Sequence, residues 1–162
     1  MLTTLWPGVR QLVNQLFASR WLDLFDQHSK LHDIGFPGVY LLAYSTKQLQ
    51  GNRVRPKDVF YVGMTHAGLS KRLNQFMKGI ENGQHHSGAK RFFIENTKRK
   101  GFKRLRSKKR FFVASLSIKC NYKKSGRTPE DLRRMGLVTA LEYYVLAHLR
   151  EKLGKEPKLN KK

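Results

Sequence analysis

The sequence predicts a fold that mixes strands with helices, in the order β-β-α-α-β-α behind an N-terminal helix. Two early runs, Val39–Ser45 and Val59–Gly63, are rich in β-branched and aromatic residues and are bounded by turn residues. An apolar stripe at helical spacing follows at Leu69–Ile80, and Thr128 opens a long helical pattern. At 162 residues, the chain is long enough for one domain with a buried core.

The first segment, residues 1–34, is expected to be a helical extension that packs on the core. From Leu2 to about Gln27 its apolar residues recur at helical spacing. They are Trp6, Val9, Val13, Leu16 and Phe17. Pro7 is tolerated because it lies near the helix start. The same amphipathic face would suit a partner subunit, so the sequence leaves both a monomer and a homodimer open.

The rest of the chain, residues 35–162, is predicted as one domain. Gly51-Asn52 predicts a turn, and the short connection makes the first two strands antiparallel. A shorter helix is expected at 89–97, a third strand at 111–118 and the long helix from about 128 to 153. The Thr-Pro-x-Asp pattern at the start of that last helix is typical of an N-cap.

The charge balance indicates the class of partner. Thirty-three Lys and Arg against eleven Asp and Glu give a formal net charge of +22. Such a surface collects polyanions, of which nucleic acid is the commonest. A solubility surface or a membrane-headgroup binder fits less well, because the basic residues cluster and no lipidation signal is visible.

The densest basic cluster is the run KRKGFKRLRSKKR, which we expect to form a basic hairpin. Phe102 lies within it, and Phe111 and Phe112 follow. Basic residues with interleaved aromatics are a general signature of nucleic-acid binding, although a hairpin that is only solvated is the alternative. The run would hold a duplex by its backbone without reading its sequence. The predicted contacts are Lys98, Arg99, Lys100, Lys103, Arg104, Arg106, Lys108, Lys109 and Arg110.

Several other classes of protein are disfavoured. Cys120 is the only cysteine, which excludes an intrachain disulfide and a cysteine zinc cluster and suits a reducing, cytoplasmic setting. The opening MLTTLWPGVR lacks the apolar stretch and cleavage site typical of a signal peptide, and no apolar run is long enough to span a membrane. We therefore expect a cytoplasmic protein with no membrane partner and no small-molecule cofactor.

Two tripeptides on the first two strands mirror each other, GVY at 38–40 and YVG at 61–63. Residues two apart share a face of a strand, so each tyrosine lies beside a glycine. We expect the glycines to leave open space there, into which a ligand can approach, at some cost in strand stability. A core tyrosine beside a small residue explains either tripeptide alone, whereas the mirrored pair favours a ligand site.

Two charged residues on the predicted helices are candidate partners of that ligand. Arg72, at the edge of an apolar stripe, would hold a phosphate with two hydrogen bonds, although a snorkelling stem is favoured for an isolated arginine. Glu142 lies in TALEYYVLAHL, where no residue three or four positions away is a cation. A carboxylate there needs a partner from elsewhere, and an arginine across the fold and a divalent metal are equally good candidates.

These residues, taken in order, resemble the GIY-YIG nuclease superfamily. The elements that match in order and approximate spacing are GVY, YVG, Arg72 within GLSKRL, Glu142 and Asn160 within PKLNK. The loop ENGQHHSG resembles the histidine-serine loop of the homing members. Each motif is short, but five ordered elements spread over residues 35–160 make a more specific pattern.

The resemblance implies a fold and a reaction. The fold is α+β (an α/β sandwich), a small three-stranded antiparallel sheet flanked by helices. The reaction is hydrolysis of DNA phosphodiester bonds with one divalent metal, Mg²⁺ or Mn²⁺, by a restriction, repair or defence endonuclease of bacterial or phage origin. RNA is the alternative substrate. A catalytically silent basic DNA- or RNA-binding protein on the same scaffold is the alternative function.

The resemblance also assigns roles to the matching residues. Glu142 would be the sole protein ligand of the metal, and Arg72 would hold the scissile phosphate and stabilise its transition-state charge. Tyr40 and Tyr61 would lie near the attacking water, with Tyr40 preferred as the proton acceptor. A free phenol has a pKa of about 10, so we expect the cations of the site and the metal to favour the phenolate. The structural glycines of the motif are Gly38 and Gly63.

The remaining assignments and the departures concern single positions. His86, in preference to His85, matches the loop histidine, and Asn160 matches a late asparagine that supports the site. Members often carry a histidine or tyrosine one turn after the arginine, where this chain has Phe76, which cannot relay a proton. Many also carry a lysine soon after YVG, for which His66 would be the substitute. One extra residue separates YVG from the arginine.

Overall fold

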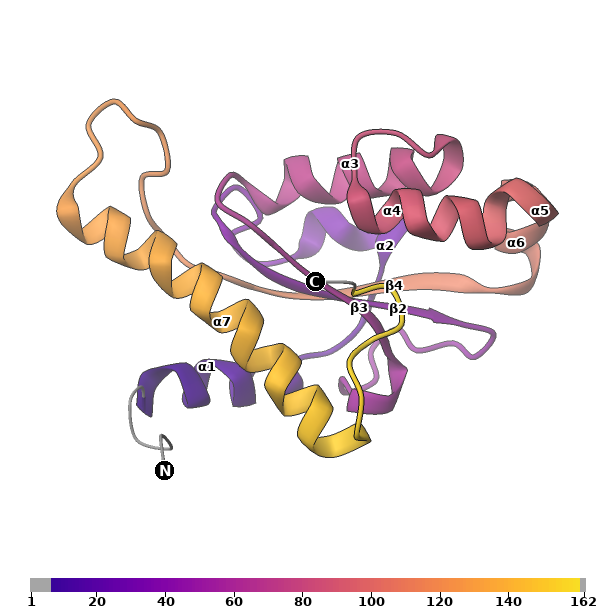
Figure 1. The fold of residues 1–162 in the computed structure, drawn as a ribbon, viewed down its shortest axis with the longest axis horizontal. Coiled ribbons are helices and arrows are strands. Elements are labelled where there is room, and N and C mark those ends of the chain that lie inside the picture. The colour runs from indigo at the N-terminus through magenta and orange to yellow at the C-terminus, as the bar shows by residue number, and fades with distance from the viewer. Residues whose placement is uncertain (1–6, 161–162) are drawn as a thin grey trace.

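The computed structural model describes residues 7–160, in which a four-stranded sheet has helices on both faces (Figure 1). The helices are α1 (Pro7–Ala18), α2 (Leu24–Gln27), α3 (Leu69–Asn82), α4 (Ser87–Phe92), α5 (Lys98–Lys100), α6 (Phe102–Lys108) and α7 (Pro129–Leu153), with 3-10 turns η1 (His28–Lys30) and η2 (Pro56–Asp58) and a π-helical turn η3 (Phe93–Thr97). The strands are β1 (Leu22–Asp23), β2 (Gly38–Ser45), β3 (Val59–Thr65) and β4 (Arg110–Ser117). Helices α1 and α7 cover one face, and α2, α3 and α4 cover the other (Figure 1).

The sheet confirms the predicted α+β class but has one strand more than the three expected. Its order within residues 7–160 is β1-β4-β2-β3, and every pair is antiparallel. The extra strand comes from the N-terminal segment, where Leu22 pairs with Val113 and Asp23 with Phe112. A two-residue strand carries no periodicity, which is why the sequence pattern did not reveal it.

The predicted helix from Leu2 to Gln27 is therefore interrupted; its part before Pro7 lies outside the described residues. Helix α1 ends at Ala18, because residues 19–21 pair with the neighbouring 51–54 turn instead of continuing the helix. In that pairing the Trp21 N–H donates to the Asn52 carbonyl at 3.0 Å, and the Gly51 N–H donates to the Trp21 carbonyl at 2.9 Å. These bonds satisfy the backbone groups of Trp21, which lies beyond the end of the helix.

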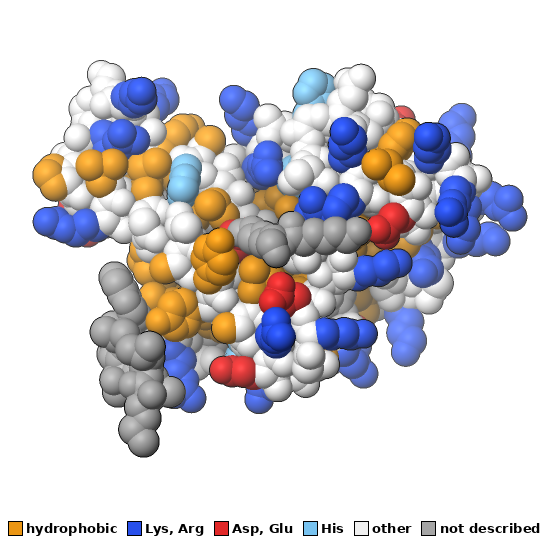
Figure 2. Space-filling model, in the orientation of Figure 1, with side chains coloured by type: hydrophobic (Ala, Val, Ile, Leu, Met, Phe, Trp, Pro, Cys, Tyr) orange, Lys and Arg blue, Asp and Glu red, His pale blue; other side chains and the backbone are white. Residues whose placement is uncertain are grey.

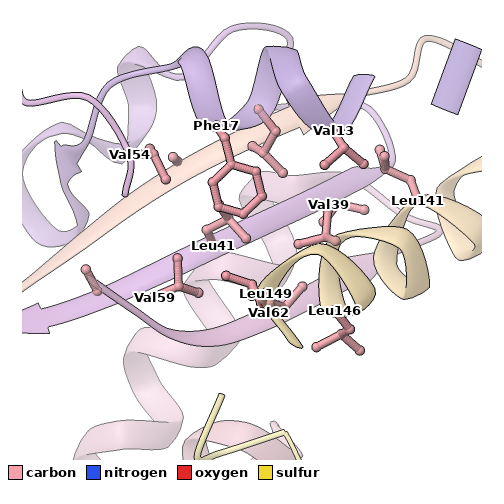
Figure 3. Close-up of a cluster of buried hydrophobic side chains, with 14 of the residues drawn as sticks. Val13, Phe17, Val39, Leu41, Val54, Val59, Val62, Leu141, Leu146 and Leu149 are labelled. Atoms are coloured by element: carbon pink, nitrogen blue, oxygen red, sulfur yellow. The ribbon is translucent and has the colours of Figure 1, made fainter. Parts of the chain in front are cut away.

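Strand β2 is the centre of the fold, and its side chains divide between two cores. Its odd-numbered residues, Val39, Leu41 and Ala43, pack with α1 and α7 in the cluster drawn in Figure 3. Its even-numbered residues, among them Tyr40 and Leu42, pack against α3 and α4. A strand buried on both faces has an almost continuous apolar sequence, which GVYLLAYS shows.

A bulge shifts the register between β2 and the edge strand β3. Leu42 pairs with Tyr61, but the next residue, Ala43, pairs with Val59, which leaves Phe60 as the extra residue. Because a bulge changes which face a side chain reaches, Phe60 joins Tyr61 on the α3–α4 side.

The two longest helices begin and end at residues that suit those positions. The Thr128 hydroxyl accepts from the Asp131 N–H, Asp131 bonds back to the Thr128 N–H, and Gly154 at φ 72° ends α7. Gly83 ends α3 in the same left-handed conformation. No helix of the described residues is long and apolar enough to cross a membrane.

The basic run at residues 98–110 is not the expected hairpin. It forms the short helices α5 and α6, which are joined at Gly101 with φ 74°, and the strand β4 begins only at Arg110. The buried Leu105 anchors α6 to the core. The sequence did not reveal α6, because its apolar face has only one buried residue and charged residues surround it.

Candidate active site

Two tyrosines lie side by side under α3 and α4, with ring centroids 6.1 Å apart. The strand register brings them together, because Tyr40 is paired with Gly63 and Leu42 with Tyr61. Tyr40 is fully buried and Tyr61 is 6% exposed, so the second phenol is the one nearer to solvent. The two mirrored tripeptides therefore converge on one point of the sheet.

The glycines of the two tripeptides do not leave the open space that we expected. A Cβ on Gly63 would overlap the Tyr40 phenol and lie 2.8 Å from the Tyr61 ring. A Cβ on Gly38 would overlap the Leu116 carbonyl and lie 2.9 Å from the Ser117 Cα of β4. One glycine thus admits the partner tyrosine and the other admits the neighbouring strand, so both are needed for packing.

A third glycine, which the sequence did not single out, accommodates the other phenol. A Cβ on Gly88, in the first turn of α4, would lie 2.6 Å from the Tyr61 ring and 3.0 Å from its hydroxyl. Its signal in the sequence was weak, because a glycine next to a loop is common in any helix start. The backbone therefore approaches both phenols closely, at Gly63 beside Tyr40 and at Gly88 beside Tyr61.

His86 holds the Tyr40 phenol and is fixed in one tautomer. It is 3% exposed and is the N-cap of α4, where its Nδ1 accepts from the Ala89 N–H at 3.2 Å. The hydrogen of the neutral ring must then be on Nε2, which lies 2.7 Å from the Tyr40 hydroxyl oxygen and donates to it. Burial, and then the charges of Arg72 and Arg91, lower the pKa of His86 to about 3, so the ring is neutral. His85, by contrast, is exposed, and its backbone has the left-handed conformation, with φ 66°.

The protein alone does not favour the phenolates that we expected. Burial raises the pKa of Tyr40 well above 10, and the Tyr61 charge adds to this, although Arg72 opposes it by charge and hydrogen bonding. Burial also raises the pKa of Tyr61, against the charges of Arg72 and Arg91. Desolvation outweighs the cations, so an ionised phenol here needs further positive charge.

Arg72, in the first turn of α3, has a buried N–H donor that makes no hydrogen bond to another described residue. Its Nη1 donates to the Gln75 side chain at 3.3 Å, but its Nε is buried and has no hydrogen-bond partner among the described residues. The side chain lines an open hollow of about 320 Å³ together with Lys71, His66 and the end of β3. A buried donor without an acceptor costs about 1–3 kcal/mol, so this guanidinium has hydrogen-bonding capacity left at the margin of the hollow.

Glu142 approaches from the opposite layer, on α7. It is 4% exposed, and its negative charge is among the causes that raise the pKa of Tyr61, after burial. One turn earlier, Thr139 lies 2.8 Å from the ring of His66, which ties α7 to the loop after β3. The edge of β3 is thus where Arg72 from one layer and Glu142 from the other meet the phenols.

The donor set fits a magnesium ion better than a zinc ion. Among the described residues no three His, Cys, Asp or Glu side chains gather as a cluster that could hold a metal. Zinc sites need three or four such ligands, whereas Mg²⁺ keeps several waters and binds through one or two carboxylates and substrate phosphates. A single carboxylate such as Glu142 therefore suits Mg²⁺ or Mn²⁺.

Asn160 completes the edge strand as a substitute for a fifth strand. Its Oδ1 accepts from the Val62 N–H at 2.9 Å and its Nδ2 donates to the Val62 carbonyl at 2.7 Å. The preceding residue, Leu159, is held at its carbonyl by Arg91 Nε at 2.8 Å. The tail thus crosses the exposed edge of β3, next to Tyr61, and fixes it.

The basic segment, residues 98–110, lines two hollows that differ in charge. Lys100, Arg104, Lys108 and Lys109 line one hollow with Tyr44, and the Lys109 ammonium lies 4.9 Å from the centre of that ring. The other side of α6 carries Lys103 and Arg106, which with Arg110 line a hollow that also contains Asp23, Asp26 and Glu81. Figure 2 shows Lys and Arg gathered at the end of the molecule where α5 and α6 lie.

Comparison of the chain with models of protein families, with curated proteins and with solved structures found no match. Of the residues singled out in the sequence, Tyr40, Tyr61, Arg72 and His86 lie in direct or electrostatic contact with one another, and Glu142 acts on the same phenol. Gly88 and Arg91 are additions from the structure.

Proposed function

We propose that the protein is a metal-dependent endonuclease that hydrolyses DNA phosphodiester bonds at a GIY-YIG-type site. The observation that carries this proposal is the buried, unpartnered Nε of Arg72 beside two phenols, on a chain with a net charge of +22. A phosphate oxygen is the acceptor that best satisfies a guanidinium in a basic hollow. Arg72 would hold the scissile phosphate and stabilise the charge that develops on it.

Tyr40 is the proton acceptor in this proposal. His86 Nε2–H donates to its oxygen, and Arg72 adds positive charge nearby, so both neighbours stabilise a phenolate. Because His86 is a donor here, it cannot also take the proton from Tyr40. It is a positioning residue, and Tyr61, whose ring lies 6.1 Å from that of Tyr40 and nearer to solvent, is the group through which the Tyr40 proton would leave.

Glu142 would hold Mg²⁺ or Mn²⁺. The ion, when bound, supplies the positive charge that lowers the pKa of water and of nearby phenols and neutralises phosphate charge. This is the charge that the buried phenols need in addition to Arg72. Asn160 keeps the edge strand in place, and so keeps Tyr61 in position.

One observation supports a different function, a catalytically silent nucleic-acid-binding protein. Phe76, one turn after Arg72, is fully buried and stacks on Tyr61 with ring centroids 5.9 Å apart. A proton-relaying side chain is therefore missing at this position. The charge of the surface would still bind DNA or RNA, with a strong dependence on salt.

Cleavage assays separate the two functions. Purified protein and Glu142→Ala are incubated with supercoiled plasmid and with duplex, branched and single-stranded DNA and RNA, in Mg²⁺, in Mn²⁺ and in EDTA. The proposal expects metal-dependent nicking by the wild type on at least one DNA form and none by the variant. Equal cutting by both proteins, or none by either on every substrate, would contradict it and leave the binding function.

A further inference from the structure

Two cation-lined hollows lie at opposite ends of the edge strand β3, on the same face of the sheet. The first contains Arg72 and Lys71 and lies where β3 ends, at Thr65. The second has a volume of about 250 Å³ and lies beside Tyr44, whose ring is 6.2 Å from that of Phe60 at the start of β3. The proposed function accounts for the first hollow and assigns no task to the second.

The second hollow has the composition of a phosphate-binding surface. Among the described residues that line it, four are cations and none is acidic. Lys100, Arg104 and Lys108 are exposed and all line this hollow, and Arg104 and Lys108 lie four residues apart on one face of α6. On the other side of α6, Arg110 lies 3.9 Å from Asp23, so the cations there are partly neutralised. The uncompensated positive charge is therefore directed to one side.

Helix α4 runs along β2 from Tyr40 to Tyr44, and Tyr44 lines the second hollow. Its N-cap, His86, contacts Tyr40, and its last residue, Phe92, packs on Tyr44 with centroids 5.1 Å apart. Four residues of a strand separate the two tyrosines by about 13 Å. With the cleaved bond placed at Tyr40 and the duplex laid along β2, where each DNA strand presents one phosphate per 3.4 Å, this distance corresponds to about four base pairs.

We propose that the α5–α6 hollow binds the phosphate backbone of duplex DNA on one side of the cleaved bond, roughly four base pairs away. The site is thus asymmetric, because Lys100, Arg104 and Lys108 hold one arm of the substrate in addition to the contacts at the cleaved bond. This inference rests on the proposed function for the position of the cleaved bond. The binding of duplex DNA by the hollow does not depend on cleavage.

Two charge-reversal variants test the hollow against a matched control. Lys100→Glu with Arg104→Glu removes two cations that line it, and Lys123→Glu with Lys124→Glu changes the net charge equally at exposed residues far along the chain from it. Binding of a 30-bp duplex is measured by fluorescence anisotropy in EDTA, over a range of salt. We expect the first pair to weaken binding by ~10-fold or more and to reduce the salt slope by about 2, because each phosphate contact contributes about 0.9. The control pair should change affinity less than ~3-fold. Circular dichroism confirms that both variants are folded.

A nested set of duplexes then tests the asymmetry. The duplex is shortened from either end towards the mapped cleavage site, and kcat and KM are measured for each length. We expect KM to rise ~10-fold or more when one arm falls below about four base pairs, and to respond little to the other arm, with kcat unchanged. In the Lys100→Glu, Arg104→Glu protein this difference between the arms should disappear.

The outcomes distinguish this inference from the proposed function. Equal losses of affinity in the two charge-reversal variants, or no loss in either, would overturn the role of the hollow even if the enzyme cleaves DNA. Equal sensitivity to both arms would overturn it as well. Absence of cleavage, together with a loss of affinity confined to the first variant, would contradict the nuclease and support the hollow as a duplex-binding surface.

Discussion

Gly63→Ala tests the packing of the two phenols directly. The added methyl group would overlap the Tyr40 phenol and lie 2.8 Å from the Tyr61 ring, so one or both rings must move. Overpacking a core costs about 1–3 kcal/mol. The reduced backbone freedom of alanine returns about 0.5–1 kcal/mol. The net loss of about 0–2.5 kcal/mol has its centre at ~1 kcal/mol, which corresponds to a fall in Tm of about 2–4 °C for a chain of this size.

The displaced phenols should reduce activity far more than stability. Thermal unfolding by circular dichroism gives the Tm, and single-turnover cleavage gives the rate at a temperature where both proteins are folded. Gly136→Ala is the control, because nothing lies within 4 Å of its added Cβ on the exposed side of α7. We expect it to raise stability by about 0.5–1 kcal/mol and to leave the rate unchanged. A Gly63→Ala protein with the wild-type Tm and rate would refute the close approach of Tyr40 to β3.

Three further variants test the groups around the phenols. Tyr40→Phe should lower kcat by at least about 10²-fold, the usual effect of removing a general base, and by more than Tyr61→Phe does; a larger loss for Tyr61→Phe in single-turnover assays would reverse the assignment. The folded-state pKa of His86, about 3, lies below its unfolded value near 6.5, so the stability that the neutral ring contributes above pH 6.5 is lost as the pH falls toward 3. Denaturant titrations should therefore show the wild type losing about 2 kcal/mol more than His86→Gln between pH 7 and pH 5, and parallel losses would argue against a buried neutral ring. Asn160→Ala should cost about 1–3 kcal/mol, because it removes both hydrogen bonds to Val62, and unchanged hydrogen exchange at the Val62 amide would contradict the strand-like pairing.

The sequence predicted those parts of the fold that have a regular pattern. The strands β2, β3 and β4 and the helices α3 and α7 are found within about two residues of their predicted ends, because each has an apolar periodicity or a clear cap. The strand β1 was missed because two residues carry no period. The pattern of residues 98–110 predicts a hairpin, because charged residues surround Leu105, the buried residue that makes α6 amphipathic.

The candidate site was predictable as a set of residues but not as an arrangement. Motif spacing selected Tyr40, Tyr61, Arg72 and Glu142, but it gave the wrong reason for the glycines. Close approach across strands depends on the register, and the register depends on a bulge at Phe60 that no local pattern marks. The tautomer of His86 likewise follows from its position as an N-cap, which only the structure gives.

Single-turnover nicking of supercoiled DNA by the wild type and Glu142→Gln, in Mg²⁺ and with DNA binding measured in parallel, tests the central claim most directly. Glu151→Gln, an exposed carboxylate on the same helix, is the matched control. We predict that Glu142→Gln lowers the nicking rate by at least about 10³-fold while its fold and its affinity for DNA are retained, because it removes the carboxylate that holds the metal. Glu151→Gln should nick at the wild-type rate. A Glu142→Gln protein that nicks DNA as fast as the wild type would show that this site does not carry out the reaction.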